Sequence, residues 1–141
     1  MCEEDVDHML SQSDFAIGSD GISLPLSPSE NKGKPHPRNY GTFPRFLRLA
    51  REKGFCDLET AVHRITGLSA SYIGLPDRGL VQPGYVADLT LFDPQTVADR
   101  ATYEDPFQKP EGICHVFMAG QPALLHGRQT EHRLGQFLLK R

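Results

Sequence analysis

The sequence has little of several features that identify whole classes of proteins. It has no tryptophan and 3 cysteines in 141 residues, and the cysteines are far apart and form no CxxC pair. A disulfide-stapled secreted fold and a thiolate zinc site are therefore disfavoured, and we expect a reducing, cytoplasmic location. The apolar runs are only a few residues long, so the sequence predicts no membrane-spanning helix.

Positive charge is also sparse and scattered. Lysine and arginine number 15 against 18 acidic residues, which gives a formal net charge of -3 without any basic block. We therefore expect neither nucleic acid nor a membrane as a partner. The sequence has no P-loop, GxGxxG or GxSxG motif and no HxH or HExxH spacing. These absences disfavour nucleotide binding, a serine-hydrolase elbow and a zinc centre held by this chain alone.

Helical patterns occupy much of the first 76 residues. Acidic residues followed by an apolar spacing predict a first helix over residues 3–10. Thr42 is the predicted N-cap of a second helix, with Pro44 in its first turn and Gly54 at its end. Asp57 is placed to cap a third helix, and a short helical turn is predicted at 69–73. Two helices present apolar faces: Phe43, Phe46, Leu47 and Ala50 on the second, and Leu58, Ala61, Val62 and Ile65 on the third.

Strand patterns dominate after Pro76. Residues 88–92 alternate as in a half-buried strand, and Ala119-Gly120 divides two further runs, 113–118 and 122–125, that predict a hairpin. The change from helices to strands predicts a boundary near residues 74–80, and hence two domains, 1–76 and 77–141.

Asp20 is the first candidate for chemistry. It follows Phe15-Ala16-Ile17, a predicted buried strand, within the glycine turn Gly18-Ser19-Asp20-Gly21. Ligands of barrel and open α/β enzymes bind where strands end, so a carboxylate there serves as a metal ligand or general base. Ser-Asp-Gly is also a common turn sequence in which aspartate bonds the local backbone. Residue type and spacing leave both interpretations open.

His36-Pro37-Arg38 lies in a proline- and glycine-rich stretch, residues 21–40, that is predicted to be a loop. Arg38 can bind a carboxylate through two parallel hydrogen bonds, and it can equally be a solvated loop charge. His36 can ligate a metal but has no second histidine at ligand spacing. Cys56 and Cys114 are predicted to be small core residues.

Five segments together resemble the C-terminal part of the N-acyl-D-amino-acid deacylases (D-aminoacylases) of the amidohydrolase superfamily. They are GSDG at 18–21, HPRNYGTFPR at 36–45, RGLVQPGYVADLTLFD at 78–93, VADRATYEDP at 97–106 and PEGI at 110–113. The PGxxADL run is shared by many amidohydrolases, whereas HPRNYGTFPR is more particular to the deacylases.

The resemblance implies an α/β fold in which a (β/α)8 metal-dependent hydrolase barrel is followed by a small β-sandwich-like domain. Such a barrel takes about 250 residues. The chain therefore resembles a C-terminal fragment. Residues 1–76 would supply the last barrel strand, the active-site loop and helices, and residues 77–141 would supply the small β-rich domain and tail.

The resemblance also implies roles for two residues. Asp20 matches the aspartate that binds metal and acts as general base, and Arg38 matches the arginine that holds the substrate's α-carboxylate. The implied reaction is hydrolysis of the linear amide bond of N-acyl-D-amino acids to a carboxylate and a D-amino acid, with zinc as cofactor. The family's HxH pair, bridging cysteine and two later histidines are not in this chain. We therefore expect that the isolated chain does not bind zinc stably and is inactive.

Two other interpretations stay open. The chain can be a non-catalytic remnant or binding module, or it can derive from an amidohydrolase of cyclic amides, such as a dihydropyrimidinase-like enzyme. The HPR and GTFPR runs favour the deacylase over the cyclic-amide enzyme. In a fragment the apolar helix faces lack the barrel surface that they cover in the family, which predicts self-association.

Overall fold

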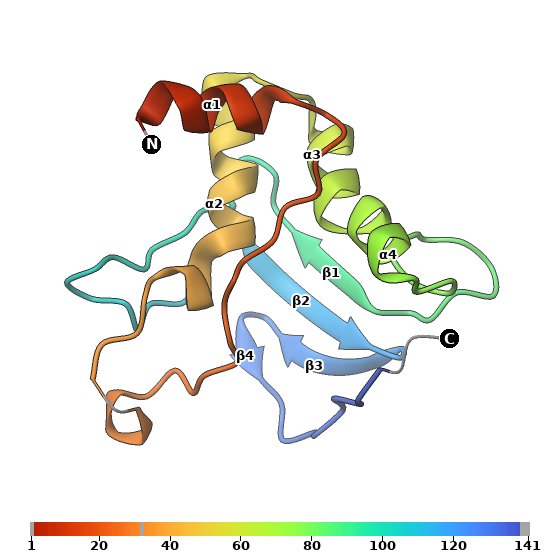
Figure 1. Cartoon of the computed structure of the whole chain (residues 1–141). Coiled ribbons are helices and arrows are strands. Elements are labelled where there is room, and N and C mark those ends of the chain that lie inside the picture. The colour runs from red at the N-terminus through yellow and green to blue at the C-terminus, as the bar shows by residue number, and fades with distance from the viewer. Residues whose placement is uncertain (1, 32, 139–141) are drawn as a thin grey trace.

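Helices occupy the first half of the chain and strands the second (Figure 1). The computed structural model describes residues 2–31 and 33–138, so both predicted domains contain residues outside the described part. The helices are α1 (Glu3–Ser11), the 3-10 helix η1 (Pro28–Glu30), α2 (Arg38–Lys53), α3 (Leu58–Ile65) and α4 (Gly67–Ile73). The strands are β1 (Leu89–Phe92), β2 (Ile113–Met118), β3 (Gln121–Leu125) and β4 (Arg128–Gln129). The predicted α/β class is confirmed, and the division at residue 76 stays a prediction.

The strands form an antiparallel sheet in the order β1-β2-β3-β4. The predicted turn Ala119-Gly120 joins β2 to β3, and both residues have positive φ (49° and 78°), as a type I′ hairpin turn requires. His126-Gly127 has similar angles (49° and 71°) between β3 and β4. The three predicted strands are therefore confirmed, whereas β4 was not predicted because two residues are too few to show an alternating pattern.

Helix α2 begins earlier than predicted. Pro37 occupies the N-cap position, and the Thr42 hydroxyl donates instead to the Arg38 carbonyl one turn back (3.0 Å). The expectations that Thr42 caps this helix and that Arg38 lies in a loop are therefore wrong. Pro44 lies inside the helix, where it removes one N–H from the hydrogen-bond ladder. The helix ends at Gly54 (φ 65°), as predicted.

Helices α3 and α4 follow their predicted signals. Asp57 Oδ1 accepts the Thr60 N–H (2.8 Å), and this hydrogen bonding to Thr60 lowers the pKa of Asp57 below its ordinary value. Helix α4 ends at Gly74 (φ 75°), again as predicted. In the described part of the chain no helix combines the length and the apolar character that crossing a membrane requires.

Residues 15–17 do not form the predicted strand. The Ile17 N–H donates to the carbonyl of Arg64 in α3 (3.3 Å), and Phe15 is 46% exposed. A strand is stable only when a neighbouring strand supplies a ladder of hydrogen bonds. The sheet of the described residues contains only β1 to β4, so this segment is extended but unpaired.

The core lies between α2, α3 and the segment that follows β1. It contains Phe46, Leu47 and Ala50 of α2, Ala61 of α3 and Val97. Phe92 at the end of β1 and Ile113 at the start of β2 pack against this cluster. They connect the sheet, which lies in the lower half of the view in Figure 1, to the helices above it.

Arg64 of α3 is a charged side chain buried in this core, with 1% of its surface exposed. Its Nε donates to the Phe15 carbonyl (2.8 Å), and NH1 donates to the Leu10 carbonyl (2.5 Å). The guanidinium also lies over the ring of Phe46, 4.9 Å from the centroid. A buried guanidinium is tolerated only where acceptors replace its water. The two hydrogen bonds supply acceptors to Nε and NH1 and hold the segment after α1, whereas NH2 is buried without a hydrogen-bond partner among the described residues.

The predicted apolar helix faces are only partly covered. Phe46, Leu47 and Ala50 are buried, but Phe43 on the same helix is 40% exposed. Met9 of α1 is 50% exposed. Self-association through such faces stays a prediction.

We expect Arg64→Met to lower the free energy of unfolding by about 3 kcal/mol, because the carbonyls of Leu10 and Phe15 lose their charged donor. Urea unfolding of the 141-residue chain measures this change. Arg51→Met is the matched control, since Arg51 also donates to two backbone carbonyls, of Pro94 (2.9 Å) and Val97 (3.0 Å), but from an exposed position. Equal losses in the two variants would contradict the role of burial.

Candidate active site

The side chains of Asp20 and Arg38 meet in an ion pair between Asp20 Oδ2 and Arg38 NH1. Arg38 is the first residue of α2, and Asp20 lies on the extended segment between α1 and α2. The Asp20 side chain is 88% exposed and the Arg38 side chain 38%. The structure therefore brings the two predicted site residues together on an accessible surface.

The backbone of Asp20 has φ 48°, in the left-handed region that aspartate tolerates better than most residues. The turn around it is closed by Ser19, whose Oγ accepts the Gly21 N–H (3.2 Å). The Asp20 carboxylate therefore does not form the Asx-type turn that the sequence also allowed. Its carboxylate instead points to Arg38 and is free of the local backbone.

Asn39 joins the turn after Asp20 to the start of α2. Its Oδ1 accepts the Ile22 N–H (2.8 Å), and its Nδ2 donates to the His36 carbonyl (3.0 Å). A Cβ added to Gly21 would lie 3.1 Å from Asn39 Oδ1, so the two segments are in close contact. Asn39 was not singled out from the sequence; the available signal was its place directly after Arg38 in the HPRNYGTFPR run.

His36 has a partner at each ring nitrogen. Its Nδ1 accepts the Arg38 N–H (3.0 Å), and its Nε2 lies 3.0 Å from the hydroxyl of Tyr103. Both metal-binding positions of the ring are thus engaged within the chain. Tyr103 was not predicted as a site residue, because no local pattern links it to His36.

The cysteines do not extend this site. Burial raises the pKa of the Cys56 thiol, which disfavours the thiolate that a nucleophile or metal ligand requires. Cys114 is exposed, so its prediction as a core residue is wrong. It is the exposed residue of β2, whose other residues are partly buried.

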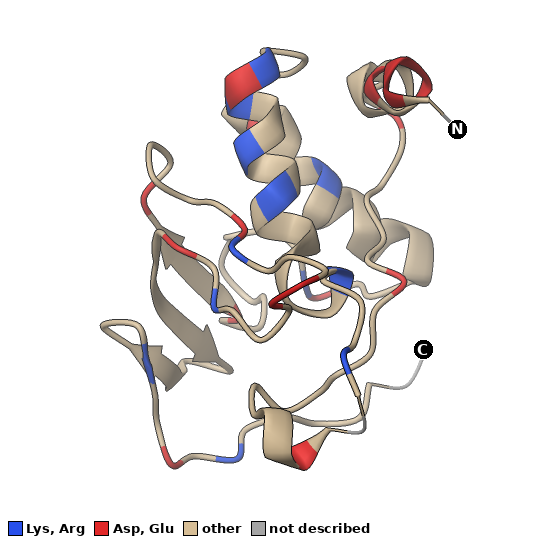
Figure 2. Ribbon diagram, turned by 90° about the vertical axis from the view of Figure 1, so that its left-hand side faces the viewer, with Lys and Arg blue, Asp and Glu red and all other residues tan. Residues whose placement is uncertain are grey.

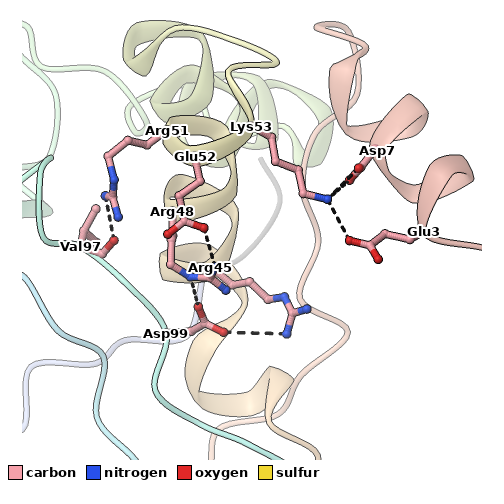
Figure 3. Close-up of polar contacts among 9 residues, drawn as sticks. All are labelled: Glu3, Asp7, Arg45, Arg48, Arg51, Glu52, Lys53, Val97 and Asp99. Carbon is pink, nitrogen blue, oxygen red and sulfur yellow. Dashed lines mark hydrogen bonds and ion pairs between the residues drawn. The ribbon is translucent and has the colours of Figure 1, made fainter.

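Basic residues recur along α2 (Figure 2), and the side chains of three of them, Arg45, Arg48 and Arg51, hold the segment that follows β1 (Figure 3). Arg48 Nε donates to Asp99 Oδ1 (2.8 Å), and Arg45 NH1 lies 3.8 Å from Asp99 Oδ2. The hydrogen bond to Asp99 is the main cause that raises the pKa of Arg48. Because the Asp99 side chain is only 10% exposed, this network fixes the segment against α2 close to Arg38.

An open groove of about 1270 Å³ lies between α1, α2 and this segment, and Arg38, His36 and Tyr103 contribute to its lining. Its volume exceeds the roughly 300–1,000 Å³ that is common for small-molecule sites. In this structure Arg38 and His36 therefore line an open groove and not a closed pocket, and Asp20 is not part of its lining.

Residues 24–123 match the sequence profile described as the amidohydrolase family. A D-aminoacylase from Alcaligenes xylosoxydans xylosoxydans is 44% identical over 141 residues, covering 99% of this chain and 28% of the relative. The chain thus spans little more than a quarter of the length of this curated relative.

Solved structures agree with the sequence comparison. A crystal structure of D-aminoacylase superposes with a TM-score of 0.84 at 45% identity, covering 96% of this chain and 27% of the other. An N-acyl-D-glutamate deacylase from Bordetella bronchiseptica, complexed with zinc and a phosphonate inhibitor, gives 0.77 at 40% identity, covering 87% and 25%. The fold described above therefore matches about a quarter of a larger amidohydrolase fold.

Proposed function

Because the chain belongs to the amidohydrolase family, we propose that it is part of a longer enzyme that hydrolyses the amide bond of N-acyl-D-amino acids. The observation that carries the proposal is the contact between Asp20 and Arg38. In an N-acyl amino acid the scissile amide nitrogen and the α-carboxylate are bonded to one carbon atom. A base for the amide and a receptor for the carboxylate must therefore lie side by side, as these two residues do.

Asp20 is the proposed proton carrier. Its carboxylate takes a proton from the water that attacks the amide carbonyl, and it returns that proton to the nitrogen of the leaving amine. The exposed carboxylate and its freedom from the local turn support this role.

Arg38 is the proposed receptor for the α-carboxylate. The ion pair with Asp20 uses NH1, and a guanidinium has five N–H donors in a planar fork. The same side chain can therefore bind a substrate carboxylate through two parallel hydrogen bonds next to the base.

Zinc is proposed as the cofactor of the longer enzyme, because a relative of this chain is described with zinc. A zinc site takes three or four protein ligands. The described residues contain no group of three or more His, Cys, Asp and Glu side chains placed to hold a metal. The chain by itself does not fit zinc, and Asp20 is the one ligand that we propose it contributes.

The same proposal includes expectations about the two domains, the location and the partners. The helical region 1–76 is the end of a (β/α)8 barrel, and 77–141 is the small β-rich domain. The location is cytoplasmic, which the free cysteines Cys2, Cys56 and Cys114 support. The partners are the substrate and no nucleic acid.

Replacing the matched segment of the Alcaligenes D-aminoacylase with this chain tests the role of Asp20. We expect the grafted enzyme to deacylate N-acyl-D-amino acids, and Asp20→Asn to lower kcat on the order of 10²- to 10⁴-fold through loss of proton transfer. Asp14→Asn is the control, since Asp14 is an exposed aspartate on the same segment. A native graft that folds without turnover would favour the non-catalytic remnant.

In the same graft, Arg38→Lys is expected to raise KM about tenfold with a smaller change in kcat, because an ammonium cannot reproduce the planar fork. Steady-state kinetics with an N-acyl-D-amino acid give both constants. An unchanged KM would remove Arg38 from the carboxylate site while leaving the role of Asp20 intact.

The isolated 141-residue chain is expected to retain no stoichiometric zinc after dialysis and to show no turnover, because one ligand cannot fill a tetrahedral site. Metal analysis and a deacylase assay on the purified chain measure the two properties. One zinc per chain together with turnover would overturn the expectation.

A further inference from the structure

The segment that follows β1 crosses the start of α2 and is held there at two points. Asp99 accepts a hydrogen bond from Arg48 Nε (2.8 Å), which is drawn in Figure 3. A Cβ added to Gly41 of α2 would lie 3.0 Å from Asp99 Cβ, so the segment packs closely on the helix. Farther along, Lys34 Nζ donates to the Glu104 carbonyl (2.6 Å). These contacts set the position of Tyr103, which lies between them in the sequence.

Tyr103 contacts His36 through both its ring and its hydroxyl. The ring centroids are 5.0 Å apart and the planes are inclined by 74°, an edge-to-face arrangement. The hydroxyl lies 3.0 Å from Nε2. The imidazole of His36 is therefore held in one orientation by a residue that is distant in sequence.

His36 in turn supplies what the start of α2 lacks. Pro37 is the N-cap residue and has no side-chain acceptor for the first N–H groups of the helix. His36 Nδ1 accepts the N–H of Arg38, the first helical residue (3.0 Å). An Nδ1 that accepts carries no proton, so the neutral ring has its proton on Nε2 and donates it to the Tyr103 hydroxyl.

We propose that His36 and Tyr103 are positioning residues for Arg38, a role that rests on the proposed function of Arg38 as carboxylate receptor. Tyr103 orients the imidazole, the imidazole caps the Arg38 N–H, and the backbone from which the guanidinium reaches Asp20 is thereby held in place. Neither residue needs to touch the substrate. Their effect is on where the receptor lies, so it should appear in substrate binding more than in the chemical step.

Nitrogen-15 NMR of the imidazole in the intact 141-residue chain tests the contacts directly. We expect the neutral imidazole of His36 to carry no proton on Nδ1, and Tyr103→Phe to speed exchange of the Nε2 proton. His36→Ala should also speed amide exchange at Arg38, whereas His36→Asn should restore protection because its side-chain oxygen can accept the same N–H. A proton on Nδ1 in the wild-type chain would overturn the proposal.

Kinetics in the grafted enzyme test the consequence. We expect Tyr103→Phe and His36→Ala each to raise KM about three- to tenfold and to change kcat less than twofold, as a few-fold change in binding implies. The double variant should be no worse than the more affected single variant, since both remove one hydrogen bond. Tyr72→Phe is the control, because the Tyr72 hydroxyl is also exposed and donates to a backbone carbonyl, that of Asp14 (2.8 Å).

A KM in Tyr103→Phe equal to that of the Tyr72 control would overturn the positioning role and leave the proposed function standing. An inactive native graft would instead contradict the proposed function. In that case the NMR measurements decide whether His36 and Tyr103 hold Arg38.

Discussion

The rest of the site depends on the hydrogen bonds that the buried guanidinium of Arg64 makes to the chain after α1. The chain between α1 and Asp20 has no strand beside it in the described structure, so a sheet does not hold it. Arg64 takes that place: it donates to the carbonyls of Leu10 and Phe15, and its own carbonyl accepts the Ile17 N–H. Because a desolvated guanidinium is costly without acceptors, the core that buries Arg64 and the segment that supplies acceptors to its Nε and NH1 stabilise each other.

The contacts around the ion pair are of a different kind. Asn39 holds the turn after Asp20, and His36 holds the first N–H of α2, both near the surface. Each such hydrogen bond contributes little free energy when water competes for it. They are effective because the backbones that they join are already anchored, one at the buried Arg64 and the other at the start of a helix that packs in the core. The buried contacts give the site its rigidity, and the exposed ones set the direction of its side chains.

This division explains what the sequence could predict. The Asp57 cap, the stop at Gly54 and the turn at Ala119-Gly120 depend on residues within one turn, and all three were predicted. The strand at 15–17 was wrong, since a strand is decided by a neighbour that the local sequence does not show.

The sequence did not predict the start of α2 or the buried position of Arg64, and the two reasons are related. The cap at Thr42 was wrong because His36 already provides an acceptor for the Arg38 N–H, so the helix can begin before Thr42. Arg64 follows Ala61 by three residues and shares its buried face, which was the available signal, but periodicity alone does not tell a buried arginine from a solvated one. For the pairing of Asp20 with Arg38, only the family resemblance linked the two residues, because no local pattern spans them.

If the proposed function holds, the base and the carboxylate receptor lie on a part of the enzyme whose geometry is set by its own contacts. The metal ligands other than Asp20 then lie elsewhere in the enzyme. It follows that substitutions at His36, Asn39 or Arg64 change the position of the bound substrate relative to Asp20 and leave the other ligands of the metal in place.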